Sequence, residues 1–340
     1  MEKLAIVILN WNGASMLRAF LPGVVRFSSG QATVYVADNG STDDSLVLLK
    51  EKFPSVRLIS FRENYGFAEG YNQALAQIES EYYLLLNSDV EVSSGWLSPL
   101  LDYMDSHPGV AACQPKIRSQ IDRGSFEYAG ASGGYLDRLG YPYCRGRIFS
   151  TVEKDNGQYD KPVSVFWATG AALLVRREAY WEVGGLDGRF FAHMEEIDFC
   201  WRLRSRGYGI VCIPSSTVYH VGGGTLSKEN PRKTFLNFRN NLLMLYKNLP
   251  DEELHRTLRM RWWLDRLASF SFLLSGSWGS CRAVWRAWRA YGRMKPDFSE
   301  DRKRCQKAAV LRSIPEMASF SILHRYYIKQ ERQYKDLPQK

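Results

Sequence analysis

Apolar and polar residues alternate in blocks over the first 115 residues of the chain. Short apolar runs predict strands that are buried on both faces of a sheet; they are Leu4–Leu9, Val34–Ala37, Val56–Phe61 and Tyr82–Leu86. The segments between them predict helices over Ser15–Phe27, Asp43–Lys52, Ala68–Glu79 and Gly95–His107. Strands that alternate with helices predict an α/β fold with a mostly parallel, Rossmann-like sheet flanked by helices.

The rest of the chain divides into three parts. Residues 118–162 are rich in Gly, Tyr and Arg without a clear period, which predicts an irregular hairpin or loop insertion. Ordered elements resume at 163–177, with a helix after Phe190 and short strands at Ile210–Ile213 and Thr217–Tyr219. Beyond residue 231 the pattern predicts helices over 231–249, 251–274, 281–294 and 301–313. We therefore expect a first domain over 1–230 and a C-terminal helical appendage over 231–340.

Charge is distributed unevenly between these two parts. The chain has 45 Lys and Arg against 36 Asp and Glu, a formal net charge of +9. Residues 231–340 hold 23 of the basic and 10 of the acidic residues, a net charge of +13, which leaves −4 for residues 1–230. This asymmetry indicates that the C-terminal part faces an anionic partner, either a membrane surface or nucleic acid.

Composition narrows the class of protein. The 340 residues, 45% apolar and 24% charged, are typical of a globular protein with a substantial core and exclude disordered, collagen-like and disulfide-scaffold chains. Six cysteines without a C-x-x-C pair predict reduced thiols. We find no secretory signal. The longest apolar run, Val163–Val175, is shorter than the ~20 residues of a spanning helix, so we expect a cytoplasmic protein.

Polar side chains at strand ends are candidates for a ligand site, because ligands of open parallel sheets bind beyond the carboxyl ends of the strands. Asp89 follows one predicted strand and His220 follows the last one. A carboxylate and an imidazole at one edge of a sheet can hold a divalent cation. The alternatives are a turn or helix-capping aspartate and a structural histidine, and the spacing alone does not exclude them.

Three carboxylates, Glu195, Glu196 and Asp198, lie near the start of a predicted helix. The helix dipole favours their charged forms, whereas mutual repulsion raises the pKa of at least one, as a general base at neutral pH requires. The alternative is a solvated face. We assign Asp198 to such a face, in an i,i+4 pair with Arg202, and leave both interpretations open for Glu195 and Glu196.

Two further polar loops have both a structural and a binding interpretation. Asp38, in a turn that continues to Asp43, either opens a helix or accepts hydrogen bonds from a nucleobase or ribose. Asn64 and Gly66 belong to a small-residue loop whose backbone amides either face a ligand or form a simple turn.

The C-terminal segment 259–293 interleaves five tryptophans with seven arginines. Tryptophan favours the headgroup region of a membrane, and arginine binds anionic lipids there. We therefore expect membrane contact through 259–293, ahead of helices packed on the body with a solvated basic face. Binding of single-stranded nucleic acid ranks well below both, and we expect no nucleic-acid partner.

Several of these segments together resemble glycosyltransferase family 2, in its rhamnosyltransferase-like branch of bacterial polysaccharide biosynthesis. The matching pieces keep their order over about residues 3–250: Ile6–Gly13, Asp38–Asp43, Asn64–Ala68, Leu86–Asp89, Thr169–Ala171, Phe191–Arg202 and His220. The resemblance implies an inverting, nucleotide-sugar-dependent transferase with a GT-A-type fold.

The resemblance also implies roles for individual residues. Asp89 matches the last position of the family's D-x-D metal motif, and His220 matches a histidine that joins the Mn²⁺ or Mg²⁺. Glu195-Glu196 match the Glu-Asp doublet that supplies the general base, so Glu196 is the candidate for that base. The implied donor-binding positions are Asn10, Asn12, Asp38, Asn64, Gly66, Asn87, Ser88 and Gly170. Two departures stand out: Asn87 replaces the motif's first carboxylate, and Glu196 replaces aspartate.

The function implied is transfer of a sugar from a nucleotide-sugar donor to a saccharide acceptor, usually lipid-linked, in cell-surface polysaccharide assembly. The basic C-terminal part would then hold a cytoplasmic enzyme at the inner face of the bacterial membrane. Arg145 and Arg147 of the insertion are expected to close over donor or acceptor. The alternatives are a nucleotidyltransferase or sugar-nucleotide hydrolase on a similar body, and a non-catalytic scaffold that binds sugar nucleotides.

Overall fold

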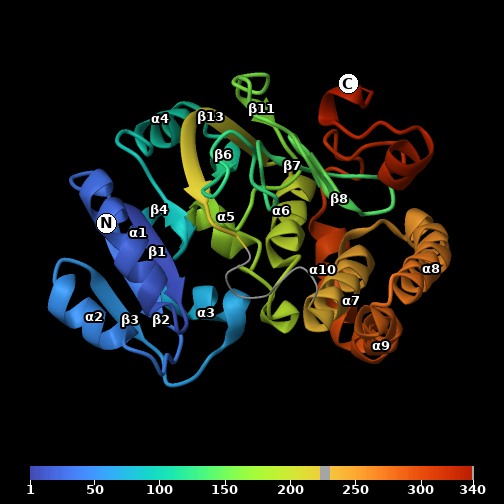
Figure 1. Ribbon diagram of the computed structural model, residues 1–340, viewed down its shortest axis with the longest axis horizontal. Coiled ribbons are helices and arrows are strands. Elements are labelled where there is room, and N and C mark those ends of the chain that lie inside the picture. The colour runs from blue at the N-terminus through green and yellow to red at the C-terminus, as the bar shows by residue number, and fades with distance from the viewer. Residues whose placement is uncertain (223–229, 339–340) are drawn as a thin grey trace.

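A large mixed sheet forms the centre of the protein, whose computed structural model describes residues 1–222 and 230–338 (Figure 1). Its strands follow the order β11-β13-β6-β12-β4-β1-β2-β3, and β5 pairs with β13. The strands are β1 (Glu2–Asn10), β2 (Thr33–Asp38), β3 (Arg57–Ser60), β4 (Ser80–Asn87), β5 (Val90–Glu91), β6 (Val110–Ser119), β11 (Val163–Ser164), β12 (Ala172–Arg176) and β13 (Gly209–His220). β12 runs antiparallel to β4 and β6, so β1, β2, β3, β4, β6 and β13 all share one direction.

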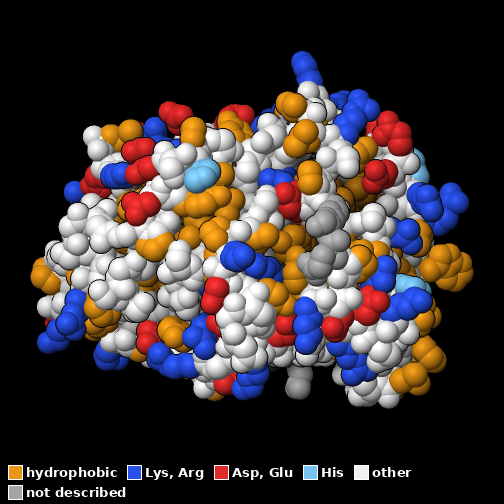
Figure 2. All heavy atoms as spheres, turned by 90° about the horizontal axis from the view of Figure 1, so that it is seen from above, with side chains coloured by type: hydrophobic (Ala, Val, Ile, Leu, Met, Phe, Trp, Pro, Cys, Tyr) orange, Lys and Arg blue, Asp and Glu red, His pale blue; other side chains and the backbone are white. Residues whose placement is uncertain are grey.

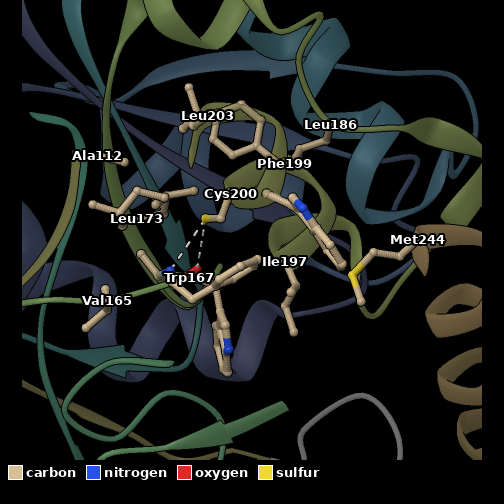
Figure 3. Packing of buried hydrophobic residues seen from close by; sticks show 14 of the residues in the cluster. Ala112, Val165, Trp167, Leu173, Leu186, Ile197, Phe199, Cys200, Leu203 and Met244 are labelled. Carbon is tan, nitrogen blue, oxygen red and sulfur yellow. Dashed lines mark hydrogen bonds between the residues drawn. The ribbon is translucent and has the colours of Figure 1, made fainter. Parts of the chain in front are cut away.

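Helices cover both faces of this sheet. α1 (Ala14–Ser28), α2 (Ser45–Lys52) and α4 (Ser98–Ser106) share one hydrophobic core, and α3 (Gly66–Leu75), α5 (Arg177–Glu182) and α6 (Glu195–Ser205) share the other. The side chains of β1 alternate between the two, Leu4 in the first core and Ala5 in the second, as the pleat of a strand dictates. Figure 3 shows the second core around Cys200, whose thiol meets the backbone of Ala168.

The predicted elements of the first 115 residues are confirmed, and two strands, the short β5 and the central β6, are added. β6 lies between β13 and β12 in the middle of the sheet, where the apolar pattern predicts no element. Its first residues, Val110 to Cys113, are mostly small, and Pro115 and Lys116 follow. Such a segment lacks the bulky branched residues that predict a strand, although eight of its ten residues are buried.

The insertion at 118–162 is more regular than the sequence suggests. It contains a four-stranded antiparallel sheet of β7 (Gly134–Leu136), β8 (Pro142–Cys144), β9 (Arg147–Ile148) and β10 (Thr151–Val152). Arg145 and Arg147, expected to close over a substrate, are buried inside it. Arg145 donates to the carbonyl of Lys161 (3.2 Å) and Arg147 to that of Tyr128 (2.8 Å). Their guanidinium groups therefore stabilise the insertion itself.

The C-terminal part is helical, as predicted, and it continues the core of the body. Its helices are α7 (Pro231–Asn248), α8 (Asp251–Leu274), α9 (Trp278–Met294) and α10 (Ser299–Ala308), with short turns η2 (Lys295–Phe298), η3 (His324–Ile328) and η4 (Tyr334–Asp336). Leu242 to Leu245 of α7 belong to the core that holds α6. The last segment lies beside β7 and β8 (Figure 1), where the Ala318 N–H donates to the carbonyl of Leu136 (2.8 Å).

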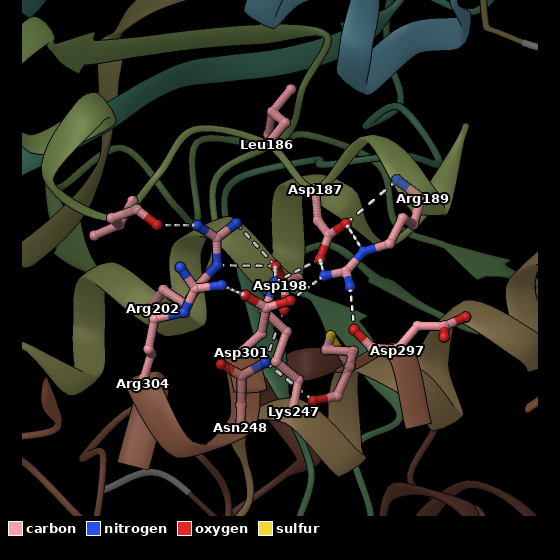
Figure 4. Close-up of polar contacts among 12 residues, drawn as sticks. Leu186, Asp187, Arg189, Asp198, Arg202, Lys247, Asn248, Asp297, Asp301 and Arg304 are labelled. Atoms are coloured by element: carbon pink, nitrogen blue, oxygen red, sulfur yellow. Dashed lines mark hydrogen bonds and ion pairs between the residues drawn. The ribbon is translucent and has the colours of Figure 1, made fainter. Parts of the chain in front are cut away.

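Buried charges join α6, α7 and the turn η1 (Gly188–Phe190) in what we call the Asp198 network (Figure 4). Asp198 has no exposed surface and accepts hydrogen bonds from Arg202 (2.9 Å), Lys247 (3.0 Å) and Asn248 (2.8 Å). The expected i,i+4 pair with Arg202 is present. It lies in the interior, however, so the prediction that Asp198 belongs to a solvated face is wrong.

Candidate active site

Polar residues from four parallel strands meet at the carboxyl edge of the sheet. Asn10 at the end of β1 pairs with Asp38 at the end of β2, and its neighbour Leu9 pairs with Asn87 at the end of β4. β13 ends at the same edge with His220, opposite Val90 of β5. The strand register therefore brings Asn10, Asp38, Asn87 and His220 to one edge.

Asp89 and His220 face each other there. His220 Nε2 lies 3.1 Å from Asp89 Oδ1 and 3.4 Å from the Asn87 amide nitrogen. Burial lowers the pKa of His220, but the hydrogen bond to Asp89 and the nearby carboxylate of Glu127 outweigh it and raise this pKa to about 10. Burial raises the pKa of Asp89, and the hydrogen bond to His220 outweighs it, so this pKa is lowered. The two side chains form a compact, oppositely charged pair.

A second carboxylate, Glu127, lies on the other side of the His220 ring. Its Oε2 is 3.6 Å from His220 Nδ1, and its side chain is 7% exposed. Gly222 leaves room for it, because a Cβ there would come within 2.7 Å of Glu127 Oε1. No sequence signal points to Glu127, which lies in the Gly-rich insertion more than ninety residues before His220.

Glu195 and Glu196 begin α6, which confirms the predicted helix start. Glu195 is buried, whereas Glu196 retains partial exposure. Burial raises the pKa of Glu196 to about 7, despite hydrogen bonds from backbone N–H groups of the first turn. Burial, and then the charge of Glu196, raise the pKa of Glu195. Oε2 of each carboxyl is buried and lacks a hydrogen-bond partner among the described residues.

A short connection joins the glutamates to the strand edge. A Cβ at Gly170 would lie 3.8 Å from Glu196 Cβ, so the glycine leaves space beside the glutamate. One residue further, the carbonyl of Ala171 accepts a hydrogen bond from the Asn87 N–H (3.0 Å). Glu196 and the Asp89–His220 pair therefore belong to the same end of the sheet, linked through Gly170 and Asn87.

Asp38 and Asn10 are occupied by each other and by the following turn. Asp38 is fully buried and accepts hydrogen bonds from the Asn10 amide (3.0 Å) and the Ser41 N–H (3.0 Å). Asn10 donates also to the Ser41 hydroxyl, while its Oδ1 lacks a partner among the described residues. Asp38 thus orders the turn after β2, and it has no surface open to a nucleobase in this conformation.

The other predicted donor-binding residues line the same edge in three loops, which follow β1, β3 and β4. Asn12 is exposed and accepts from the Thr42 N–H (2.7 Å), and Asn64, also exposed, accepts from the Gly66 N–H (2.8 Å). Gly66 has φ +79 and lies against Phe191. Ser88 is partly exposed, and a Cβ at Gly13 would lie 3.7 Å from its hydroxyl.

The side chains at Asp89 and His220 fit a divalent cation with few protein ligands. Within residues 1–222 and 230–338, no group of three or more His, Cys, Asp and Glu side chains has metal-binding geometry. Hard cations that carry substrate phosphates, however, need only one or two carboxylates besides phosphate and water. Asp89 would supply an oxygen, and His220 Nε2, 3.1 Å away, would supply a nitrogen once the imidazolium loses its proton on metal binding. Glu127 lies at the other ring nitrogen, as an orienting carboxylate does in metal-bound histidines.

Comparison with known proteins identifies the family. The family model of Glycosyl transferase family 2 matches residues 5–184. The chain is 29% identical over 237 residues to the N-acetylglucosaminyl-diphospho-decaprenol L-rhamnosyltransferase of Mycobacterium tuberculosis, covering 64% of this chain and 76% of that protein. It is 23% identical over 251 residues to the low-salt glycan biosynthesis hexosyltransferase Agl10 of Haloferax volcanii, covering 72% and 75%.

Solved structures share the fold. The chain resembles Staphylococcus aureus TarS 1–349 in complex with UDP, with a TM-score of 0.52 and 16% identity over 90% of this chain and 88% of that one. It also resembles GalNAc-T7 with UDP, GalNAc and Mn²⁺, with a TM-score of 0.57 and 15% identity over 74% and 49%. The predicted GT-A-type fold and the rhamnosyltransferase-like resemblance are confirmed, and the chain belongs to glycosyltransferase family 2.

Proposed function

We propose that the chain is an inverting glycosyltransferase. It would move a sugar from a nucleotide-sugar donor to a saccharide acceptor carried on a polyprenyl diphosphate, in bacterial cell-surface polysaccharide assembly. The observation that carries the proposal is that the candidate cation ligands and the candidate general base lie at the same edge of the sheet. Asp89 and His220, 3.1 Å apart, would hold the cation, and Glu196 is a partly exposed residue whose carboxyl pKa is raised to about 7.

In this proposal Glu196 is the general base. The acceptor hydroxyl attacks the anomeric carbon from the side opposite the nucleotide, and its proton passes to the carboxylate of Glu196. A base with a pKa near the working pH is ionised and still basic enough to accept that proton, a contribution of typically about 10²–10⁴-fold. Single displacement inverts the anomeric centre. Asp89 and His220 would hold the cation, which supplies charge neutralisation for the leaving diphosphate.

Substitution of the two glutamates tests this role. The substrates are nucleotide sugars, first dTDP-L-rhamnose, with a synthetic N-acetylglucosaminyl diphosphate lipid, chosen to match the name of the mycobacterial relative. We expect Glu196→Gln to keep nucleotide binding and to lose transfer, and Glu195→Gln to lose less because Glu195 is buried. Full turnover by Glu196→Gln refutes the proposal, and turnover of donor without acceptor supports the hydrolase alternative.

We also propose that the hairpin of α8 and α9 binds the anionic inner face of the membrane. No described helix is long and apolar enough to cross a bilayer. Four residues at i, i+4, i+7 and i+11 of α8 are nonetheless exposed: Trp263 (64%), Leu267 (64%), Phe270 (57%) and Leu274 (74%). They form one apolar stripe on the helix. Exposed arginines of the hairpin accompany it: Arg256, Arg259, Arg282, Arg286, Arg289 and Arg293.

Part of this segment faces inward instead. Arg261 is 1% exposed and donates to the carbonyl of Leu139 (3.1 Å), and Trp288 donates to the buried Asp265 (3.0 Å). These side chains hold α8 and α9 to the body and to each other. The stripe and the outer arginines remain available, and Figure 2 shows hydrophobic and basic side chains together along the right-hand edge, on the side of these helices.

Vesicle binding tests the membrane proposal. The full chain should sediment with vesicles containing phosphatidylglycerol at low salt and less at about 1 M salt, where charges are screened within ~3 Å. The double substitution Trp263→Ser and Phe270→Ser should weaken binding, because each removes an exposed aromatic anchor. Val310→Ser, at a residue 75% exposed outside the hairpin, is the matched control. Equal sedimentation of both variants and the wild type refutes the proposal.

A further inference from the structure

We infer that Asn240 of α7 is a positioning residue that holds the loop Phe190–Met194 in the conformation that presents Glu196. The inference deepens the proposed function, because it rests on Glu196 as the base. The loop connects η1 to α6 and ends immediately before Glu195. Any movement of the loop therefore moves the first turn of α6, where Glu196 lies.

The loop has an unfavourable backbone conformation. Phe191 (φ 67), His193 (φ 69) and Met194 (φ 72) all lie at positive φ without being glycine. Such residues cost about 1–3 kcal/mol each and persist only where the surroundings determine the conformation strongly. Three of them within four positions, directly before a candidate catalytic glutamate, require a group that fixes the loop.

Asn240 has the contacts that such a group needs. Its side chain has no exposed surface. Its Nδ2 donates to the carbonyls of Phe190 (3.0 Å), Ala192 (2.9 Å) and His193 (2.7 Å). The amide orientation is fixed from the other side, because Arg239 Nε donates to Asn240 Oδ1 (2.8 Å). The two amide hydrogens of one side chain are thus shared among three loop carbonyls, and a neighbour holds the amide in place.

The remaining carbonyls of the loop have partners as well. Arg239 Nη2 donates to the carbonyl of Phe190 (3.0 Å), and the Phe67 N–H donates to that of Phe191 (2.9 Å). Every carbonyl from 190 to 193 therefore accepts a hydrogen bond: that of Phe191 from α3 and the other three from α7, with the Phe190 carbonyl also accepting from the Ala192 N–H (2.8 Å). Buried backbone acceptors left without partners are costly, so the positive-φ conformation depends on these donors. Asn240 contributes three of the hydrogen bonds, including those to Ala192 and His193.

Two substitutions at Asn240 separate positioning from simple stability. Asn240→Leu removes the amide donor at similar volume, and Asn240→Ala leaves space in which water can partly replace it. The matched control is Asn241→Leu. Asn241 is adjacent and equally buried, but its amide donates to Gly140 (2.7 Å) and meets only the Met194 sulfur (3.9 Å) in the loop. Each protein is measured for kcat, for UDP, GDP and dTDP affinity, and for hydrogen exchange of peptides covering 189–198.

We expect backbone amides of residues 189–198 to exchange faster in both Asn240 variants. We also expect kcat to fall about 10- to 100-fold, because small displacements of a catalytic group have effects of this size. Nucleotide affinity should be unchanged. The control should retain wild-type loop exchange and kcat even if it melts earlier. Unchanged kcat in both Asn240 variants, kcat loss without faster loop exchange, or equal kcat loss in the control would overturn the inference. Activity of Glu196→Gln would instead refute the proposed base, and the exchange data would still decide whether Asn240 holds the loop.

Discussion

Protonation of Glu196 couples the candidate active site to the stability of the whole chain. Burial raises the pKa of this carboxyl from 4.5 to about 7. Because the pKa is higher in the folded than in the unfolded state, the folded protein binds more protons between these values. Its contribution to stability is therefore fully present below about pH 4.5 and is lost as pH rises to about 7. The difference between the two pKa values corresponds to about 3 kcal/mol.

Glu196→Gln removes this titration with little change in shape. The free energy of unfolding of the variant, relative to wild type, should therefore increase from pH 4.5 to pH 8 by about 3 kcal/mol. Equilibrium urea unfolding, followed by tryptophan fluorescence at constant ionic strength, measures it. Glu51→Gln, at an exposed position of α2, controls for the loss of a charge as such.

A relative stability that stays constant from pH 5 to 8 would refute this reasoning, because it would mean that solvent reaches Glu196 freely. The same pKa predicts the acid limb of the catalytic profile. Only ionised Glu196 can accept a proton, so kcat of the wild type should rise with pH and level off above about 7. Agreement between the two experiments, one with substrate and one without, would tie the base to this residue.

Two substitutions test the packing around the site. In thermal unfolding, Gly66→Ala should destabilise the protein by about 1–3 kcal/mol, because the added Cβ would come within 2.7 Å of the Phe191 ring. The control Gly30→Ala, at a similar φ with nothing within 4 Å, should cost less in the same assay. Equal losses of stability would show that the contact with Phe191 is unimportant. Lys247→Met should cost about 1–3 kcal/mol in urea unfolding, because it removes the ammonium that the buried Asp187 and Asp198 share, although each keeps one arginine partner. A loss below about 1 kcal/mol would show that water enters the network.

The sequence predicts the first half of the sheet well for a physical reason. β1, β2 and β4 are covered on both faces, so they appear as continuous apolar runs. β6 is equally central but uses small and polar residues, which conceal it. The small sheet of β7 to β10 has strands of only two or three residues. Short strands of this kind depend on contacts with the distant C-terminal segment, and these leave no local pattern.

The residues of the candidate site also divide into those that the sequence predicts and those that it does not. Asp89, His220, Glu195 and Glu196 follow strands or begin a helix, so topology and charge single them out from the sequence alone. Glu127 and Asn240 do not, because each acts through a contact made only in the folded chain. The local sequence around a glutamate among glycines, or around an asparagine inside a helix, does not indicate which groups these side chains contact in the folded protein. Sequence reasoning therefore finds the side chains that face a ligand more readily than those that hold them.

The C-terminal helices combine two surfaces that the sequence merges into one basic segment. The inner surface of α7 supplies Lys247 to the Asp198 network and Asn240 to the loop before Glu196. The outer surface of α8 exposes the apolar stripe from Trp263 to Leu274. Since α7 packs against both α6 and α9, the helices that complete the candidate active site are continuous with those proposed to bind the membrane. Such an arrangement would keep Glu196 at a fixed distance from the surface that carries a lipid-linked acceptor.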